Sequence, residues 1–308
     1  MKDLKSKKTI QWLRLSWRRN PHLVVASFIG LIGLLVGILS IIQIRTAAID
    51  FIVNIATSLI GISITVLIID RLVEVRTIER EKKYWIRELG GTEVSDVHRA
   101  IRELKAEGWL QDGSLRYARL IGAALENTNF ERCDLAHVEL SSACLENACL
   151  SRANLTRAKL DRVNLKNANL EKANLGGANL DKANLYRANL VGANLQGASL
   201  KNASLQHADF RGAFLNNVKA HEANFEVASL VGSNLQNGHL HGVRLIRANL
   251  QGVNLRHADL RDADLTDAQL DEADIRHTKL TGAILKGASI ERIKIIKGDL
   301  NNISIQMK

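Results

Sequence analysis

The chain has 308 residues, a formal net charge of +10 and only 4% aromatic residues, with Ala, Asn and Leu in excess. Basic residues after residue 114 are interleaved with acids, which argues against the clustered basic stripe of a nucleic-acid-binding surface. Three cysteines, Cys133, Cys144 and Cys149, fit no metal-ligand spacing and leave an odd count, which indicates a reducing compartment.

Two apolar runs near the N-terminus predict a membrane anchor. Residues 23–44 contain no ionisable side chain, and residues 51–69 form a second apolar run after a short turn. A helix over the first run rises about 33 Å, the thickness of a hydrocarbon core. We expect a transmembrane helical hairpin over residues 23–69 in the lipid bilayer, preceded by a basic cytosolic segment over residues 1–22. A secretory signal peptide fits less well, because a second span follows the first.

Charge around the hairpin predicts its orientation. Lys and Arg residues precede the first span and follow the second, whereas Arg45 and Asp50 in the turn cancel. Positive residues stay on the cytoplasmic side, so we expect a multi-pass protein of a bacterial-type plasma (inner) membrane with both termini in the cytoplasm. Asp50 is interpreted as a helix cap rather than part of a transport path. Gly33 and Gly37 form a GxxxG pair that is expected to pack the two spans together.

Residues 70–112 are expected to connect the hairpin to the rest of the chain. A charged helix is predicted over residues 71–89, ending at Gly90 and Gly91, and a second helix is predicted after Ser95. An amphipathic helix placed before a repeat array is suited to cover its first open coil. The apolar face of this cap helix consists of Val97, Ile101 and Leu104.

The C-terminal two-thirds repeats every five residues. From Leu115 to Ile305 there are 39 positions five apart, and each is Leu, Ile or Phe except Ala220. The residue two positions earlier is usually Ala, and the residue just before is often Asn, Asp or Ser. A period of five is neither helical nor strand-like. Every fifth residue can point inward only if the backbone turns once in each unit, so the sequence predicts a coiled ribbon with several sides.

These units, for example ANLEKANLGGANL from Ala168 onward, resemble the pentapeptide repeat family, whose unit is A(D/N)LXX. The resemblance covers residues 113–306. It implies a β-solenoid, namely a right-handed quadrilateral pentapeptide-repeat β-helix, here preceded by the two-helix transmembrane hairpin and short capping helices. About ten coils at roughly 4.8 Å each would make a rod nearly 50 Å long. Columns of asparagine are expected to form hydrogen bonds between coils.

Ala220 departs from the repeat because it occupies a leucine position. Phe214, Val218 and Phe225 lie nearby in the sequence, and two readings are open: the phenylalanines fill the lost volume, or residues 219–221 bulge outward. We favour filling, because the register resumes without an insertion.

Several outward positions are candidates for binding. Residues twenty apart should stack, which pairs His221 with His241 and His257 with His277. Paired histidines can bind a metal or sense pH, but no third ligand is fixed, so we interpret them as solvated surface and predict no metal. The candidate interaction surface comprises His221, His241, Arg256, His257, Arg276 and His277. A further column lacks side chains and consists of Gly192, Gly212, Gly232 and Gly252.

The C-terminal coils are rich in isoleucine, with no capping helix visible before Lys308. An uncovered apolar end of a solenoid is expected to associate with itself or with a partner. The candidate residues for this end association are Ile290, Ile293, Ile295, Ile296, Ile303 and Ile305.

No nucleophile elbow, phosphate loop or metal-binding motif occurs, so we expect no enzyme activity and no cofactor. The favoured hypothesis is a membrane-tethered scaffold, a protein-interaction module whose partner is unknown and which could form a homo-oligomer. The family resemblance suggests an alternative, because some pentapeptide repeat proteins mimic DNA and modulate DNA gyrase. Mimicry requires a strongly acidic face, which the positive charge of the repeat region opposes, and we expect no nucleic-acid partner. A third hypothesis is an oligomeric membrane- or lipid-organising protein.

Overall fold

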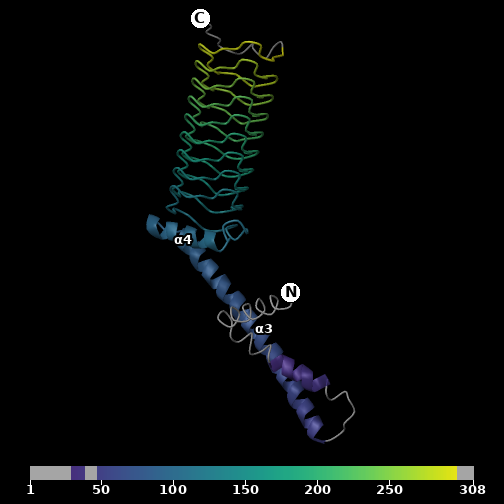
Figure 1. The fold of residues 1–308 in the computed structure, drawn as a ribbon. Coiled ribbons are helices and arrows are strands. Elements are labelled where there is room, and N and C mark those ends of the chain that lie inside the picture. The colour runs from purple at the N-terminus through teal and green to yellow at the C-terminus, as the bar shows by residue number, and fades with distance from the viewer. Residues whose placement is uncertain (1–28, 39–46, 297–308) are drawn as a thin grey trace, which may run out of the picture. The chain divides into compact units, whose positions relative to one another are not determined.

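A computed structural model describes residues 29–38 and 47–296 of the chain. It divides into two compact units, residues 1–81 and residues 82–308, and each is described by itself. The described helices are Ile29–Ile38, α3 (Ala47–Leu89) and α4 (Val94–Ala106) (Figure 1). Residues 23–28 and 39–46, which include parts of the predicted first span and the predicted turn, lie outside the described residues.

α3 is a single helix of 43 residues, where the sequence analysis expects a second span and a separate juxtamembrane helix. The two predicted helices merge because no Gly or Pro lies between residues 62 and 89 to end the first of them. Asp50 lies in the first turn of α3 and not before it, so the predicted role as N-cap is wrong. Within the described residues, one helix, Asp50–Leu89, is long and apolar enough to cross a membrane, and the apolar helix Ile29–Ile38 is shorter.

The helix Ile29–Ile38 packs closely on α3 at Gly33. A Cβ atom added to Gly33 would lie 2.6 Å from Ile60 Cγ1 and 2.9 Å from the carbonyl oxygen of Ala56, so a larger residue does not fit without movement. A Cβ atom added to Gly37 would meet nothing within 4 Å. Gly33 therefore lies at a close helix–helix contact, whereas the role of Gly37 in packing stays a prediction.

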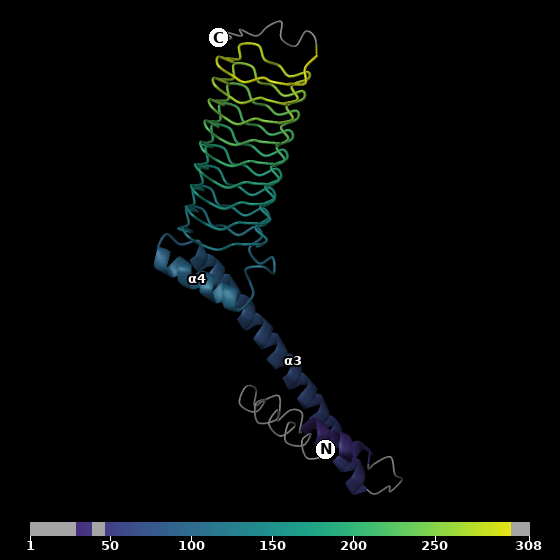
Figure 2. The ribbon, with the colours of Figure 1, turned by 45° about the horizontal axis from the view of Figure 1, so that its top comes forward.

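The second unit consists of a cap and a rod of stacked coils, visible in both ribbon views (Figures 1 and 2). Each five-residue unit contains one tight turn; in the turn from Leu170 to Ala173, the Ala173 N–H donates to the Leu170 carbonyl oxygen at 2.9 Å. The third residue of this turn, Lys172, has a φ of 55°, as type II turns require. In the described repeats, non-glycine residues adopt this left-handed conformation in turn after turn. Stacking of the coils, rather than local preference, therefore imposes the turn geometry.

Neighbouring coils are joined by parallel bridges between residues twenty apart, from Arg119–Glu139 to Asp274–Lys294. Twenty residues make four five-residue sides, so each coil of the rod has four sides, as the family resemblance implies. The bridges are isolated single pairs, and the part of the chain that the structure describes contains no longer strand. The reason is that a turn interrupts the backbone in every unit.

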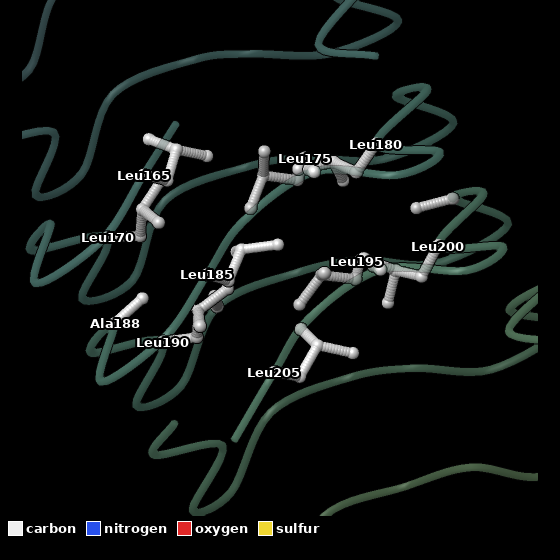
Figure 3. Packing of buried hydrophobic residues seen from close by; sticks show 14 of the residues in the cluster. Leu165, Leu170, Leu175, Leu180, Leu185, Ala188, Leu190, Leu195, Leu200 and Leu205 are labelled. Carbon is white, nitrogen blue, oxygen red and sulfur yellow. The ribbon is translucent and has the colours of Figure 1, made fainter. Parts of the chain in front are cut away.

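The interior of the rod is made of leucine and alanine columns. Leu165, Leu185 and Leu205 belong to one column and point into the interior (Figure 3), and each has 0% of its surface exposed. Burying a leucine side chain stabilises a fold by roughly 1.5–3 kcal/mol. Ala188 has 1% exposure and also faces inward, where only a small side chain fits beside the leucines. Repetition of this packing in every coil makes one continuous core.

α4 covers the first coil, as the sequence predicts for a cap helix. Val97 and Leu104 are fully buried and belong to the same apolar cluster as the rod leucines. Ile101 is partly buried against this cluster. Two hydrogen bonds join the cap to the first coil: Ala124 N–H donates to the Gly91 carbonyl at 3.0 Å, and His98 Nε2 lies 3.1 Å from the Glu126 carbonyl. The cap thus satisfies backbone groups that the first coil would otherwise leave unpaired.

At Ala220 the backbone does not bulge. Lys219 keeps its bridges to both neighbouring coils, and the Ala220 N–H donates to the His239 carbonyl at 2.8 Å. Two phenylalanine rings, Phe210 and Phe225, are buried with their centroids 5.5 Å apart. Phe214, which was expected to help fill the interior, is instead 54% exposed. It precedes an inward leucine position by one residue, where side chains point outward.

Candidate interaction surfaces of the rod

The described surface has one cavity beside the cap helix to consider as a catalytic site. A cavity of about 400 Å³ lies beside the end of α4, lined in part by Lys105, Gln111 and Arg132. Its only thiol, that of Cys133, is buried, and burial raises the pKa of this thiol to about 12. A protonated thiol is a poor nucleophile. The cavity therefore has no activated nucleophile.

The structure places His257 and His277 in adjacent coils with their rings stacked. The ring centroids are 4.7 Å apart and the planes differ by 6°. Arg276 does not face a ligand, because its guanidinium forms two hydrogen bonds with Asp274, at 2.8 and 2.6 Å. Arg256 Nε is buried without a hydrogen-bond acceptor in the described part of the chain. These four predicted residues lie close together, and Arg276 is already paired.

His221 is not stacked on His241 as the sequence analysis expects. The ring of His221 instead contacts that of His239, with the centroids 5.9 Å apart and 31° between the planes. His241 Nδ1 lies 3.5 Å from an Asp262 carboxylate oxygen. The pKa of His221 is lowered, first by burial and then by the nearby positive charges of His239 and Lys201. No group of three His, Cys, Asp or Glu residues within the described ranges is arranged to hold a metal ion.

His239 was missed because residues eighteen apart also meet on this surface. The residue just after an inward position lies near a residue eighteen positions later, which is the one just before an inward position of the next coil. Ser199 with Asp181 and Ser289 with Asp271 form side-chain hydrogen bonds at this spacing. A sequence search for contacts at both eighteen and twenty residues would have found His239.

Three acids in the acid-rich coils near the C-terminal end are paired with arginines. Asp259 forms hydrogen bonds with Arg261 at 2.8 and 2.7 Å, and hydrogen bonding to Arg261 is the main reason that the pKa of Asp259 falls to about 2. Glu272 lies 2.7 Å from Arg292. Asp259, Glu272 and Asp274 are therefore each paired with an arginine.

The isoleucine-rich end is only partly described. Ile290, Ile293 and Ile295 are partly buried against the core of the rod, and Ile296 is 40% exposed. Ile303 and Ile305 lie outside the described residues. The end-association hypothesis thus stays a prediction.

A model of the family of pentapeptide repeats matches the chain in eight copies, which together run from residue 114 to residue 287. The chain belongs to the pentapeptide repeat family. No curated protein matches the chain.

Solved structures of other pentapeptide repeat proteins are similar to this chain. HetL, which is involved in heterocyst differentiation regulation in the cyanobacterium Nostoc sp. strain PCC 7120, is 28% identical, over 66% of this chain and 95% of HetL, with a TM-score of 0.36. A trypsin-treated form of QnrB1, a plasmid-mediated fluoroquinolone resistance protein, is 21% identical over 56% of this chain and 90% of that one, with a TM-score of 0.51. The likeness to QnrB1 concerns the fold alone.

Proposed function

We propose that this protein is a non-enzymatic scaffold that binds protein through its repeat rod and is held at a membrane by α3. The observation that carries the proposal is the composition of α3. The span Asp50–Leu89 contains an eighteen-residue window with a mean hydropathy of 2.4, of which only 11% is buried. An apolar window of eighteen residues that the described part of the chain leaves uncovered is suited to a bilayer. Leu89, the last residue of the same helix, is buried in the core of the cap and rod.

The proposed anchor is the hairpin over residues 23–69, with both termini in the cytoplasm of a bacterial-type cell. The tight contact of Gly33 with Ile60 and Ala56 supports close packing of two apolar helices. The basic residues that flank the hairpin favour a cytoplasmic rod.

Protein binding, rather than catalysis, suits the rod itself. Its outward side chains lie in straight columns, because bridged residues repeat every twenty positions. Long regular surfaces of this kind are used by repeat proteins to bind other proteins. The buried thiol at the cavity beside α4 offers no comparable support for a reaction.

Membrane anchoring is tested with two matched double variants of the full chain. Ile62 and Ile64, both more than half exposed in the apolar part of α3, are replaced by Lys; Val73 and Val75, similarly exposed and two residues apart, receive the same change. Each charge near the centre of a span opposes insertion by about 2.5–3.5 kcal/mol. The native chain and the 73/75 variant should stay with membranes after alkaline extraction, and the 62/64 variant should be released. Equal extraction of all three would contradict the proposal.

DNA mimicry is the competing hypothesis, and the net positive charge of the repeat region opposes it. Mimicry needs a continuous acidic face, whereas Asp259 and Asp274 are each bonded to an arginine two residues later. A DNA gyrase supercoiling assay with the full chain decides between them. Inhibition at micromolar protein would replace the scaffold proposal with mimicry.

A further inference from the structure

One side of the rod is almost free of charge over three consecutive coils. Its outward residues fall in the segments 191–197, 211–217 and 231–237, and Arg211 is the only charged residue among them. We call these residues the neutral side. The other three sides of the same coils each carry three or more charged residues. Charged residues also bound the neutral side along the rod, with Glu171 and Lys172 at one end and Arg256 at the other.

The single charge on the neutral side is already compensated. The Arg211 guanidinium donates to both carboxylate oxygens of Asp209, from Nε to Oδ1 at 2.9 Å and from Nη2 to Oδ2 at 2.6 Å. Asp209 belongs to the adjoining side of the rod. A partner that covers the neutral side therefore does not have to bring a counter-charge. Loss of charged residues is the compositional feature of the centre of protein interfaces.

Phe214 projects from the middle of the neutral side and is 54% exposed. It occupies a column that is otherwise asparagine in the neighbouring coils, since it is bridged to Asn194 and Asn234. In this column the asparagine side chains join the coils, as where Asn194 Nδ2 donates to Asn174 Oδ1 at 3.2 Å. Phenylalanine cannot take part in this ladder.

Phe214 also removes a second hydrogen bond that its neighbours form. Asn194 and Asn234 each accept the backbone N–H two residues later through Oδ1, at 3.0 and 3.1 Å. The equivalent N–H, that of Asn216, has no acceptor in the described part of the chain. Phe214 is therefore an exposed aromatic residue that costs the fold two hydrogen bonds. Residues that destabilise their own fold in this way are expected at functional sites.

A strip without side chains lies beside Phe214 on the same side. Gly212 and Gly232 each follow the corner of the rod, with φ of +65° and +64°, and a Cβ atom added to either would meet nothing within 4 Å. The neutral side thus carries both a projecting ring and an open strip. An isologous dimer pairs the same surface of both copies, so a side with both features offers each copy a ring and a strip.

We infer that the neutral side is the docking surface for a second copy of this chain, with Phe214 at its centre. Two copies of a positively charged rod repel each other less across a neutral side than across any charged one. This inference rests on the proposed function, in which the rod acts by binding protein, and it names the partner. The contact is small, so it belongs to the weak class of interfaces, which a shared membrane strengthens by raising the local concentration.

The decisive variant is Phe214→Asn, because it restores the residue that the column prefers. If Phe214 is an interface residue, this variant should unfold at a higher temperature than the native chain and yet bind a second copy at least tenfold more weakly. A purely structural role would raise stability without changing association. Gly232→Arg is the second variant, since arginine occurs at this corner in the same column at Arg132 and Arg152, with φ near +57°. It should also weaken association by covering the strip.

Association is measured by analytical ultracentrifugation of the detergent-solubilised full chain, and in membranes by a photoreactive benzoylphenylalanine at position 214. The expected product is a crosslink of two copies of this chain. The matched control carries the same group at position 227, where Val227 is 39% exposed on a corner outside the neutral side, and should give no such product.

Three outcomes would overturn the inference: no crosslink from position 214, a crosslink to a different protein, or equal association of the native chain and Phe214→Asn. None of these outcomes would affect alkaline extraction of the same chains. Failure of self-association with intact membrane retention would therefore leave the membrane anchor of the proposed function standing. A crosslink to a different protein would support that function and reject the second copy as partner.

Discussion

α3 and the rod treat their apolar residues in opposite ways. In the rod, Leu180 and Leu200 have 0% of their surface exposed, because each coil covers the next. In the apolar part of α3, Phe51, Ile62 and Ile68 expose 66%, 57% and 55%. Leucines at a fixed period are buried by one another when the coils stack. The apolar side chains of a single helix are buried only if another surface or a lipid phase contacts them. The rod therefore buries its own apolar side chains, whereas α3 exposes its apolar side chains and is suited to an apolar medium.

The sharpest contrast comes from removing one apolar side chain from each region. Leu180→Ala should lower the free energy of unfolding of the rod by about 2–5 kcal/mol, because it leaves a cavity in a closed core. Ile64→Ala, at a residue 52% exposed on α3, should leave the free energy of unfolding of the rod unchanged. Chemical denaturation followed by circular dichroism measures both. Equal effects would mean that the rod core is not closed.

A smaller effect tests whether the asparagine ladder adds to the leucine core. Asn184 donates through Nδ2 to Asn164 Oδ1 at 3.1 Å and accepts the Tyr186 N–H at 3.1 Å. Asn184→Ala should lower the free energy of unfolding by about 1–3 kcal/mol, since both bonds are lost. Ser204→Ala in the next coil of the same column is the control, because the Ser204 hydroxyl has no hydrogen bond in the described part of the chain. If both variants unfold alike, the ladder does not stabilise the rod.

Relieving an unfavourable turn conformation should stabilise the rod by about 1 kcal/mol, whereas the two preceding substitutions destabilise it. Val227 is β-branched and has a φ of 59°, a conformation that is unfavourable by roughly 1–2 kcal/mol for a residue with a Cβ atom. Val227→Gly should therefore raise the melting temperature. Val231, four residues later, is not among the positive-φ residues, so Val231→Gly should lower it through lost chain entropy. A fall in both melting temperatures would show that the turns are not strained.

The smallest expected effect concerns acid. The pKa of Asp259 is lowered from 3.8 to about 2, mainly by hydrogen bonding to Arg261. A lowered pKa means that the ion pair stabilises the rod above about pH 4 and that this contribution is lost as the pH falls through about 2. Unfolding of the native chain and of Asp259→Asn should thus differ at pH 7 and converge near pH 2. A difference independent of pH would reject the ion pair as its cause.

The rod could be predicted because its rule is local. A leucine every fifth residue predicts a backbone that turns once in each unit, and the family resemblance adds the four-sided coil. The cap face with Val97 and Leu104 follows from helical spacing. The same logic explains why Ala220 stays in register: the bridges of its neighbours hold the backbone, whatever side chain it carries.

Other features depend on contacts between coils that a single period does not reveal. The neighbours of His221 lie eighteen as well as twenty residues away, because a side chain leans toward the next corner. Phe214 was assigned to the interior by its size, although its place one residue before Leu215 sends it outward. Gly37 could not be separated from Gly33 by spacing, since the crossing point of two helices depends on their angle. The continuity of α3 was hidden by its change from apolar to charged residues.

Because bridged residues are twenty apart, the length of the rod and the direction of its side chains change in steps of whole coils or single five-residue units. Removing one full coil, such as residues 160–179, would bring Phe214 closer to the cap by about 4.8 Å and keep it on the same side. Removing a single five-residue unit would instead turn everything beyond it by a quarter revolution. Gain or loss of repeats during evolution therefore sets two properties separately: whole coils change reach, and single units change the direction in which a docking residue points.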